Sequence, residues 1–354
     1  MFAQARYPES LSPVELDQFL ERGWFRMGQS IFTTNFLNFK NQFYSAIWLR
    51  VDLSQFEGDN RLQKLLKTNS GFSVTIQQAT LDHEKEDLYA RYKASISFQA
   101  SPSLDHLLFS RAVSNIYNTF EINVRHNTQL IACGFFDVGR KSAAGIASFY
   151  DPEYKKYSLG KYMIYLKMLH CKKLGFRYFY PGYFVPGYKL FDYKLDIGRQ
   201  ALEFLEMTSS QWHHISVYSG GHNPLGVMQQ KLNDLKLRLT EYSINSLLFR
   251  YEHFDVNLLA ELKGVELFDF PVFLHISSNV DDMANHVIVY DPRDRNYRFL
   301  HCRSVWISNQ MKNTNDMYSL SLLQQEDVYY QTPDLEDMLE RLVIVFVPKQ
   351  KYND

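Results

Sequence analysis

Apolar residues at helical spacing follow an apolar strand near the middle of the chain. The strand ends at Tyr150, and after a turn at 151–157 the apolar positions recur with the period of an amphipathic helix. The residues of this stripe are Leu159, Tyr162, Met163, Leu166 and Leu169. Because Ser158 stands at the N-cap position, we predict that the helix begins beside the opening at the end of the strand.

A second strand is predicted directly after this helix. The helix ends with the basic turn and glycine of 172–175, and the aromatic run 176–180 follows. Strand, helix and strand in this order predict a right-handed parallel crossover. The prolines and glycines of 181–187 then predict irregular backbone beside the same opening.

Charged residues cluster at the predicted start of the helix. Asp151, Lys155, Lys156 and Lys161 fall in or beside the turn that leads into it. The free N–H groups and the positive end of a helix dipole favour bound anions. The sequence therefore predicts a site for a phosphate-bearing substrate. The alternatives are an ordinary Asp-Pro turn for Asp151 and a solvated turn for the two adjacent lysines.

The pattern divides the chain into three regions, at 1–100, 101–206 and 207–354. The first begins with a helix capped by Ser12 and carries aromatic-rich strands around 43–48. The second holds the predicted crossover. The third is predicted to be an additional α+β region of unknown role that packs against the rest.

The third region opens with a long predicted helix that begins at Asn223. Its apolar face is formed by Leu225, Met228, Leu232, Leu235 and Leu239. Alternating strands are predicted at 287–290 and 297–300, joined by a turn. A last helix is predicted after Asp334, followed by a strand at 342–347.

Composition places the chain among globular proteins. It has 354 residues, of which 45% are hydrophobic and 16% aromatic, enough for roughly two domains with their own cores. Lys and Arg number 38 against 39 for Asp and Glu, so an RNA contact would have to come from a local basic patch. Because no signal peptide and no run of about 20 apolar residues is present, we expect a cytoplasmic protein without a membrane partner.

The cysteines and histidines do not predict a metal site. Cys133, Cys171 and Cys302 are far apart in the sequence and are expected to be buried thiols. His213 and His214 are adjacent, and neighbouring residues of a strand point to opposite faces. If a metal were nonetheless present, these two, His222 and His286 would be the residues to test.

Four blocks of the sequence resemble the aminoacyl-tRNA–protein transferases, the family of the eukaryotic arginyltransferases and of the bacterial leucyltransferases that act on acidic N-termini. The blocks are 149–154, 158–162, 174–183 and 193–194. Further segments, at 48–53, 61–69, 88–92 and 130–137, are also similar to the family. The resemblance extends from about Leu16 to about Glu206.

This resemblance implies a fold and an activity. The implied fold is α+β, an acetyltransferase-like mixed sheet with flanking helices. The implied activity is transfer of an amino acid, arginine in preference to leucine, from aminoacyl-tRNA to the N-terminal amine of an acceptor protein, without a cofactor, in N-terminal-residue-dependent degradation. The alternatives are a coenzyme A-dependent N-acetyltransferase and a non-catalytic module that binds protein N-termini.

The resemblance also suggests roles for particular residues. Asp151 would bind or deprotonate the acceptor amine, and Tyr183 and Tyr193 would be hydroxyl donors near the ester. Lys194 and Arg50 would contact tRNA phosphate or the acceptor's carboxylate. The other expected substrate-binding residues are Arg61, Tyr150, Lys155, Lys156, Ser158, Gly160, Lys161 and Gly182.

The chain departs from the family pattern near its N-terminus. The family usually carries a cysteine cluster there, whereas this sequence has no cysteine before Cys133 and has aromatic residues at 23–32. Tyr188 stands where the family often has another cysteine, and Asn123 where it commonly has an acidic residue. We therefore expect no metal or iron–sulfur site in this segment and an altered recognition of the acceptor's N-terminus.

Overall fold

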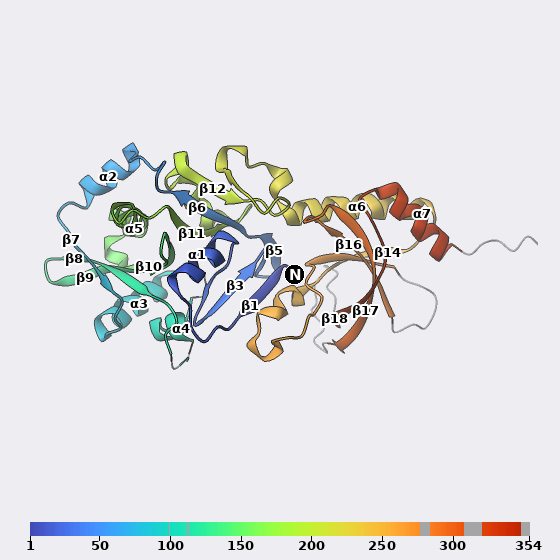
Figure 1. Cartoon of the computed structure of the whole chain (residues 1–354), viewed down its shortest axis with the longest axis horizontal. Helices are drawn as coiled ribbons and strands as arrows, with labels where there is room; N and C mark the ends of the chain where they lie inside the picture. The colour runs from blue at the N-terminus through green and yellow to red at the C-terminus, as the bar shows by residue number, and fades with distance from the viewer. Residues whose placement is uncertain (99, 111, 113, 277–283, 308–320, 348–354) are drawn as a thin grey trace, which may run out of the picture.

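The chain folds around two β-sheets that lie next to each other along the long axis of the molecule (Figure 1). This computed structural model describes residues 1–98, 100–110, 112, 114–276, 284–307 and 321–347. One sheet is mixed and eight-stranded, and the other is antiparallel and five-stranded. The predicted α+β class, with a mixed sheet and flanking helices, is confirmed, and its acetyltransferase-like character stays a prediction.

The eight-stranded sheet takes its strands from both sides of residue 100. Its order is β13 (Trp212–His214), β12 (Leu202–Leu205), β6 (Ile47–Asp52), β11 (Tyr178–Phe184), β10 (Ser142–Tyr150), β9 (Gln129–Val138), β8 (Thr119–His126) and β7 (Ser73–Gln78). The pair β10 and β11 is parallel, as the sequence predicts, and the other neighbours are antiparallel. The domain boundaries at 100 and 206 stay a prediction.

The two parallel strands are paired over a short stretch. Residues 142–144 of β10 pair with 178–180 of β11, although both strands continue further. Both are also irregular at this point, because the register shifts between Gly145 and Ala147 in β10 and between Phe179 and Gly182 in β11. The strands therefore separate beyond the bulges and leave an opening in the sheet.

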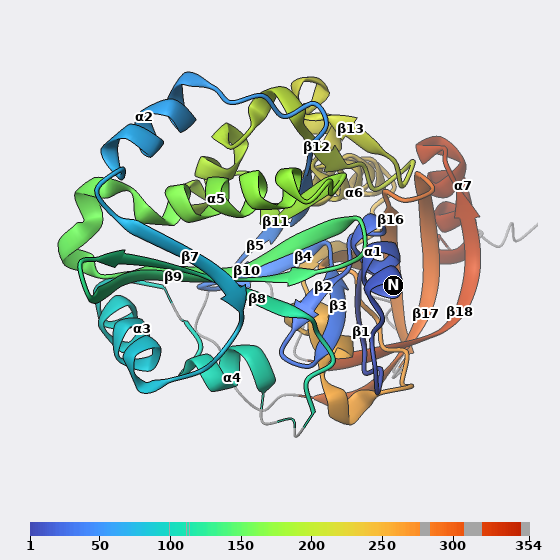
Figure 2. The ribbon, with the colours of Figure 1, turned by 60° about the vertical axis from the view of Figure 1, so that its left-hand side comes forward.

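Helices cover both faces of this sheet. The crossover helix α5 (Leu159–Lys173) and α2 (Asn60–Thr68) lie on one face, and α3 (His83–Ser95) and α4 (Leu104–Phe109) lie on the other (Figure 2). The apolar stripe predicted for α5 is only partly right. Leu166 and Leu169 are half-buried, whereas Lys167 is buried in their place.

The start of α5 differs from the prediction. The turn before it is a 3₁₀-helix, η1 (Pro152–Tyr157), which is capped by the Asp151 side chain. Ser158 joins the two helices in a left-handed conformation with φ 53°, and its side chain makes no capping hydrogen bond. Ser158 holds the N-cap position without acting as the predicted cap, because it must both end one helix and begin the next.

The predicted strand at 176–180 is shifted and too short. Strand β11 runs through Pro181 and Gly182 to Phe184, where irregular backbone is expected from the sequence. Gly182 has a φ of +90°, which a residue without a Cβ adopts without strain. This glycine therefore takes up the register shift inside the strand instead of ending it.

The N-terminal segment adds small sheets to this core. Helix α1 (Pro13–Glu21) begins with the predicted Ser12 cap, which forms a capping box with Glu15. The small sheets are formed by β1 (Ala3–Arg6), β3 (Ser30–Thr34) and β2 (Phe25–Met27), and by β4 (Phe36–Phe39) and β5 (Gln42–Ser45). The strands predicted around 43–48 are β5 and the start of β6, which are separated by Ala46.

The C-terminal sheet carries two helices, α6 (Pro224–Glu241) and α7 (Leu335–Phe346). Its strands in order are β14 (Ser246–Arg250), β15 (Val272–Ile276), β16 (Ala284–Asp291), β17 (Asn296–Ile307) and β18 (Ser321–Thr332). The predicted apolar face of α6 is confirmed, since all five of its residues are buried. The strand predicted at 342–347 is wrong. Because Met338, Leu339 and Leu342 bury one face at helical spacing, the cap at Asp334 starts a helix that extends to Phe346.

Short 3₁₀-helices connect the remaining elements. They are η2 (Lys189–Asp196), η3 (Arg199–Ala201), η4 (Ile215–Val217), η5 (Gly220–His222), η6 (Glu252–Leu258) and η7 (Ala260–Leu262).

The C-terminal sheet packs against the rest of the chain, as predicted. Phe2, Phe36 and Phe43 are buried in the same apolar cluster as α6 and the C-terminal strands. Phe2 contacts the rings of Phe36 and Phe270 at centroid distances of 5.0 Å each. The N-terminal segment thus bridges the two sheets.

The buried face of α6 predicts a matched pair of substitutions. Leu232 is 0% exposed and Leu237 is 69% exposed on the same helix. Leu232→Ala should lower the free energy of unfolding by about 2–5 kcal/mol, because it leaves a cavity in the core. Leu237→Ala should change that free energy by no more than about 0.5 kcal/mol. Urea denaturation of both variants measures the difference, and equal losses would contradict the described packing.

Candidate functional site

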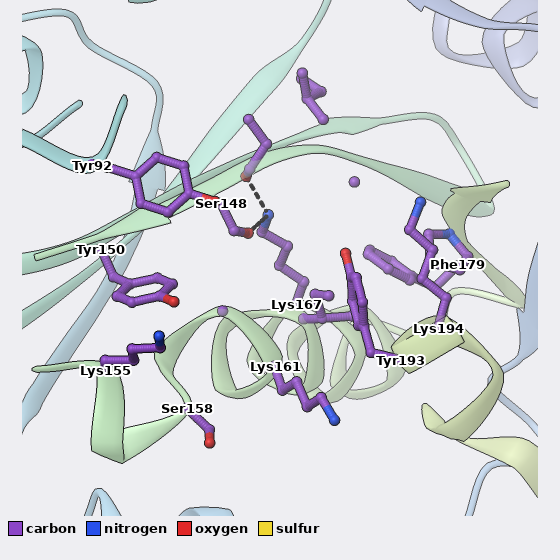
Figure 3. A pocket seen from close by; sticks show the side chains of 16 residues that line it. Tyr92, Ser148, Tyr150, Lys155, Ser158, Lys161, Lys167, Phe179, Tyr193 and Lys194 are labelled. Atoms are coloured by element: carbon purple, nitrogen blue, oxygen red, sulfur yellow. Dashed lines mark hydrogen bonds between the residues drawn. The ribbon is translucent and has the colours of Figure 1, made fainter. Parts of the chain in front are cut away.

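A cavity of about 450 Å³ lies where β10 and β11 separate (Figure 3). We call it the α5 cavity, because the first turns of α5 form one of its walls. The predicted site residues that line it are Tyr150, Lys155, Ser158, Gly160, Lys161, Tyr193 and Lys194. Its other lining residues include Tyr92 of α3, Ser148 of β10 and Lys167 of α5. The structure thus brings together residues from blocks that are separate in the sequence.

Lysines dominate the charged lining of the α5 cavity. Lysines from η1, α5 and η2 line it, and none of the described lining residues is acidic. The lysines are Lys155, Lys161, Lys167 and Lys194. With the N-terminus of α5 at the same place, the cavity suits a bound phosphate or another anion.

Lys167 is a buried lysine that was not predicted from the sequence. It is 1% exposed, and its Nζ donates to the carbonyl oxygens of Phe135 and Ala147 at 2.9 Å each and to Ser148 Oγ at 3.1 Å. Burial lowers the pKa of this lysine to about 7. The signal that was available is its position one helical turn after Met163, on the face that the apolar stripe assigns to the core.

Tyr193 and Lys194 of η2 also line the α5 cavity. Lys194 Nζ donates to the carbonyl oxygen of Tyr183 at 2.9 Å and lies over the rings of Tyr183 and Phe191. Burial lowers the pKa of Lys194 to about 7 and raises the pKa of Tyr193 to about 12. Near neutral pH, Tyr193 is therefore a hydroxyl donor and Lys194 can exchange a proton. In Figure 3 the side chains of Tyr193 and Lys167 both extend from the side of α5 toward the strands.

A second cavity, of about 490 Å³, adjoins the first. We call it the β2 cavity, because Phe25, Arg26 and Met27 of β2 line it. The two predicted site residues Gly182 and Tyr183 line this cavity and not the α5 cavity. The lining residues that the two cavities share are Gly145, Ile146, Pro181 and Lys194. The cavities therefore meet at the point where the parallel strands separate.

Gly182 has a steric reason to be glycine besides its backbone angle. A Cβ atom at this position would lie 3.1 Å from Lys194 Nζ. A side chain there would displace the ammonium group from the junction of the two cavities. This residue therefore shapes the site without contributing a functional group.

Asp151 lies beside the α5 cavity. It is buried, and one carboxylate oxygen accepts from the Glu153 N–H at 3.1 Å, while the other is 3.3 Å from Arg91 Nη2. Its carboxylate thus caps η1, the helix that carries Lys155. This geometry corresponds to the turn alternative, and a role in handling the amine stays a prediction.

Three other predicted substrate-binding residues lie away from both cavities. Arg50 is buried between the rings of Tyr178 and Trp212, and its Nε is 2.6 Å from a Glu203 oxygen. The remaining two are on the surface. Arg61 pairs with Asp196 at 2.7 Å, and the Lys156 ammonium lies over the ring of Tyr157.

The segment that replaces the family's cysteine cluster packs through aromatic rings, as predicted. The rings of Phe25 and Trp48 are stacked with centroids 4.0 Å apart, and Phe32 meets Trp48 edge-on. All three cysteines are buried, and none of them forms a disulfide. Within the described ranges, no group of three or more histidine, cysteine or acidic side chains is arranged to hold a metal ion.

No helix in the described part of the chain combines the length and the apolar character needed to span a membrane.

Comparison with known proteins gives a family for the central segment. Residues 84–203 match the family model described as "Arginine-tRNA-protein transferase, C terminus". Proteins named aspartate/glutamate leucyltransferase from Leptospira interrogans, serovars copenhageni and Lai, are each 31% identical over 164 residues. These alignments cover 45% of this chain and 62% of each relative, so the chain spans less than two thirds of the relatives' length.

Among solved structures, "The structure of L-PGS from Bacillus licheniformis" aligns with a TM-score of 0.31 and 13% identity, over 48% of this chain and 49% of that one. A similarity at this level carries no argument about function. The resemblance stated from the sequence is confirmed for residues 84–203, which are similar to the C-terminal regions of arginine-tRNA–protein transferases.

Proposed function

We propose that this protein transfers an amino acid from aminoacyl-tRNA to the N-terminal amine of an acceptor protein. The observation that carries the proposal is the α5 cavity, in which four lysines and the start of α5 face a space with no acidic residue in its described lining. The family match over 84–203 supports it. Arginine is favoured over leucine as the transferred amino acid, and we place the reaction in the cytoplasm, in N-terminal-residue-dependent degradation.

The terminal adenosine of the donor is assigned to the α5 cavity. Lys155 and Lys161 flank the start of α5 and would bind its phosphate. Tyr92 and Tyr150 offer aromatic faces on the same wall, against which the base can stack. A volume of about 450 Å³ falls in the range of small-ligand sites.

The chemistry requires no covalent intermediate on the protein, because an aminoacyl ester is already activated. The amine nitrogen bonds to the carbonyl carbon, the ester C–O bond breaks, and a proton from the amine ends on the ribose hydroxyl. Tyr193 keeps its proton, since burial raises its pKa to about 12, and can donate to the developing oxyanion. Binding both substrates in adjoining cavities supplies the proximity.

The acceptor amine arrives as an ammonium and must lose a proton before it attacks. We assign this step to Lys194, which is at the junction of the two cavities and whose pKa is lowered by burial to about 7. The Asp151 carboxylate is already bound by Arg91 and the Glu153 N–H, so we assign it the positioning of η1 and Lys155.

The direct test is transfer of labelled arginine or leucine from charged tRNA onto peptides that begin with Asp, Glu or oxidised Cys. We expect label on peptides with a free N-terminus and none on N-acetylated copies. Coenzyme A and acetyl-coenzyme A serve as the control ligands. Acetyl transfer to the same peptides, with no transfer from any charged tRNA, would contradict the proposal and favour the acetyltransferase alternative.

The lysines at the start of α5 predict the salt dependence of donor binding. Replacing Lys155 and Lys161 by alanine should weaken binding of aminoacyl-tRNA and reduce the slope of log affinity against log salt by about 0.7 for each phosphate that a lysine no longer neutralises. Lys173→Ala, at the exposed opposite end of α5, is the matched control and should leave the slope unchanged. A slope that is unaffected by the double substitution would exclude this part of the cavity as the phosphate site.

Lys194 predicts the pH dependence of transfer. A lysine with a pKa of about 7 is neutral, and able to accept a proton, above that pH, so the wild-type rate should rise with pH through about 7 and then level off. Lys194→Met should lower the rate by at least about a hundredfold. The remaining activity of Lys194→Met should rise with the fraction of peptide whose N-terminal amine is neutral. The pKa of that amine is about 7.7–8.0.

Asp151→Asn is the comparison for this pH profile. It should retain the rise near pH 7 and most of the rate, because Asp151 is assigned a positioning role. If Asp151→Asn lost the rise near pH 7 while Lys194→Met kept it, Asp151 and not Lys194 would be the residue that accepts the proton.

A further inference from the structure

A buried carboxylate with one unsatisfied oxygen lines the β2 cavity. Asp137 of β9 is 1% exposed, and its Oδ1 accepts from Arg26 Nη1 at 2.9 Å and from Thr119 Oγ1 at 2.7 Å. Its Oδ2 has no hydrogen-bond partner in the part of the chain that is described. Because buried polar atoms nearly always have a partner, this oxygen indicates a missing donor.

The partner residue Arg26 makes four hydrogen bonds, and none of them reaches Asp137 Oδ2. Its Nε donates to the Gly28 carbonyl oxygen, its Nη2 to the Leu108 carbonyl oxygen, and its Nη1 to Thr119 and Asp137. This guanidinium therefore fixes the carboxylate through one oxygen. Burial raises the pKa of Asp137 in spite of the arginine, so a further positive charge at Oδ2 would be stabilising.

The position of the β2 cavity fits a second substrate. It shares Pro181 and Lys194 with the α5 cavity, to which the donor is assigned, and Asp137 is the single acid among its described lining residues. The rings of Phe25, Trp48 and Tyr183 form an aromatic wall there. A peptide end could thus lie in this cavity with its first nitrogen directed to the junction.

We propose that Asp137 binds the α-ammonium group of the acceptor's N-terminus in the β2 cavity. The acceptor then approaches from the side of β2 and α4, and the donor from the side of α5. The transfer reaction in this inference rests on the proposed function, whereas the binding of the acceptor's N-terminus does not. It also gives a reason for product release, because the amide formed by the transfer no longer carries the positive charge that Asp137 binds.

The binding step can be tested without tRNA. A peptide that begins with Asp and is labelled at its C-terminus is titrated with the protein and followed by fluorescence anisotropy, with its N-acetylated copy as the comparison. We expect the free N-terminus to bind wild-type protein at least about tenfold more tightly. Asp137→Asn, which keeps the shape of the side chain, should remove this difference.

Asp52→Asn is the matched control. Asp52 is also buried, with one oxygen 2.9 Å from an arginine, Arg177, and the other accepting from the Ser54 hydroxyl, but it lines neither cavity. This control should retain the preference for the free N-terminus. The inference is overturned if Asp137→Asn retains the preference as well, or if both variants lose it.

A second variant covers the case in which Asp137→Asn fails to fold. Leu107, a half-buried residue of α4, lines the β2 cavity and not the α5 cavity. Leu107→Trp should fill the space, weaken binding of the free peptide at least about tenfold and leave binding of aminoacyl-tRNA unchanged. Unchanged peptide binding would exclude the β2 cavity.

Transfer assays separate this inference from the proposed function. In Asp137→Asn the KM for the acceptor peptide should rise while the KM for aminoacyl-tRNA stays constant. Wild-type protein that binds free N-termini through Asp137 and transfers nothing would refute the function alone. Normal transfer by Asp137→Asn, with an unchanged acceptor KM, would refute the inference alone.

Discussion

The site depends on the early separation of β10 and β11. Two parallel strands that paired along their whole length would close the sheet, and neither cavity could exist. Here the pairing ends after three residues in each strand, and bulges in both turn them apart. Lys167 lines this opening, and its side chain donates to the carbonyl oxygens of Phe135 in β9 and Ala147 in β10, two residues that pair with each other next to the β10 bulge. A buried lysine is thus part of the wall of the site.

The α5 cavity and the β2 cavity, which meet at this separation, differ in the charged groups that line them. On the α5 side the lining is cationic, which suits the phosphates of an RNA end. On the β2 side a carboxylate with an unsatisfied oxygen suits an ammonium group. Lys194 lies between the two, over aromatic rings and close to Gly182. The oppositely charged groups of the two substrates are thus assigned to opposite sides of one opening.

The sequence predicted the crossover and much of the α5 cavity, because both depend on residues that are near each other in the chain or in motif blocks. It did not predict Lys167 or Asp137 as site residues. Lys167 lies among the apolar residues of helix α5, and the carbonyl oxygens that it contacts belong to the strands β9 and β10. The state of Asp137 depends on Arg26, 111 residues away, and pairing over that distance leaves no local pattern. The strand predicted at 342–347 was wrong for a related reason. This apolar run also fits a helix, and the other buried residues of that helix, Met338 and Leu339, lie before the run.

The donor end of the tRNA is assigned to the opening where β10 and β11 separate. A crystal structure with an unreactive donor analogue, an adenosine whose amino acid is linked to the 3′ position through an amide, tests it most directly. We expect the adenosine phosphate at the start of α5, between Lys155 and Lys161, with the aminoacyl carbonyl directed toward Tyr193 and Lys194. An analogue bound elsewhere, with the α5 cavity empty, would contradict it.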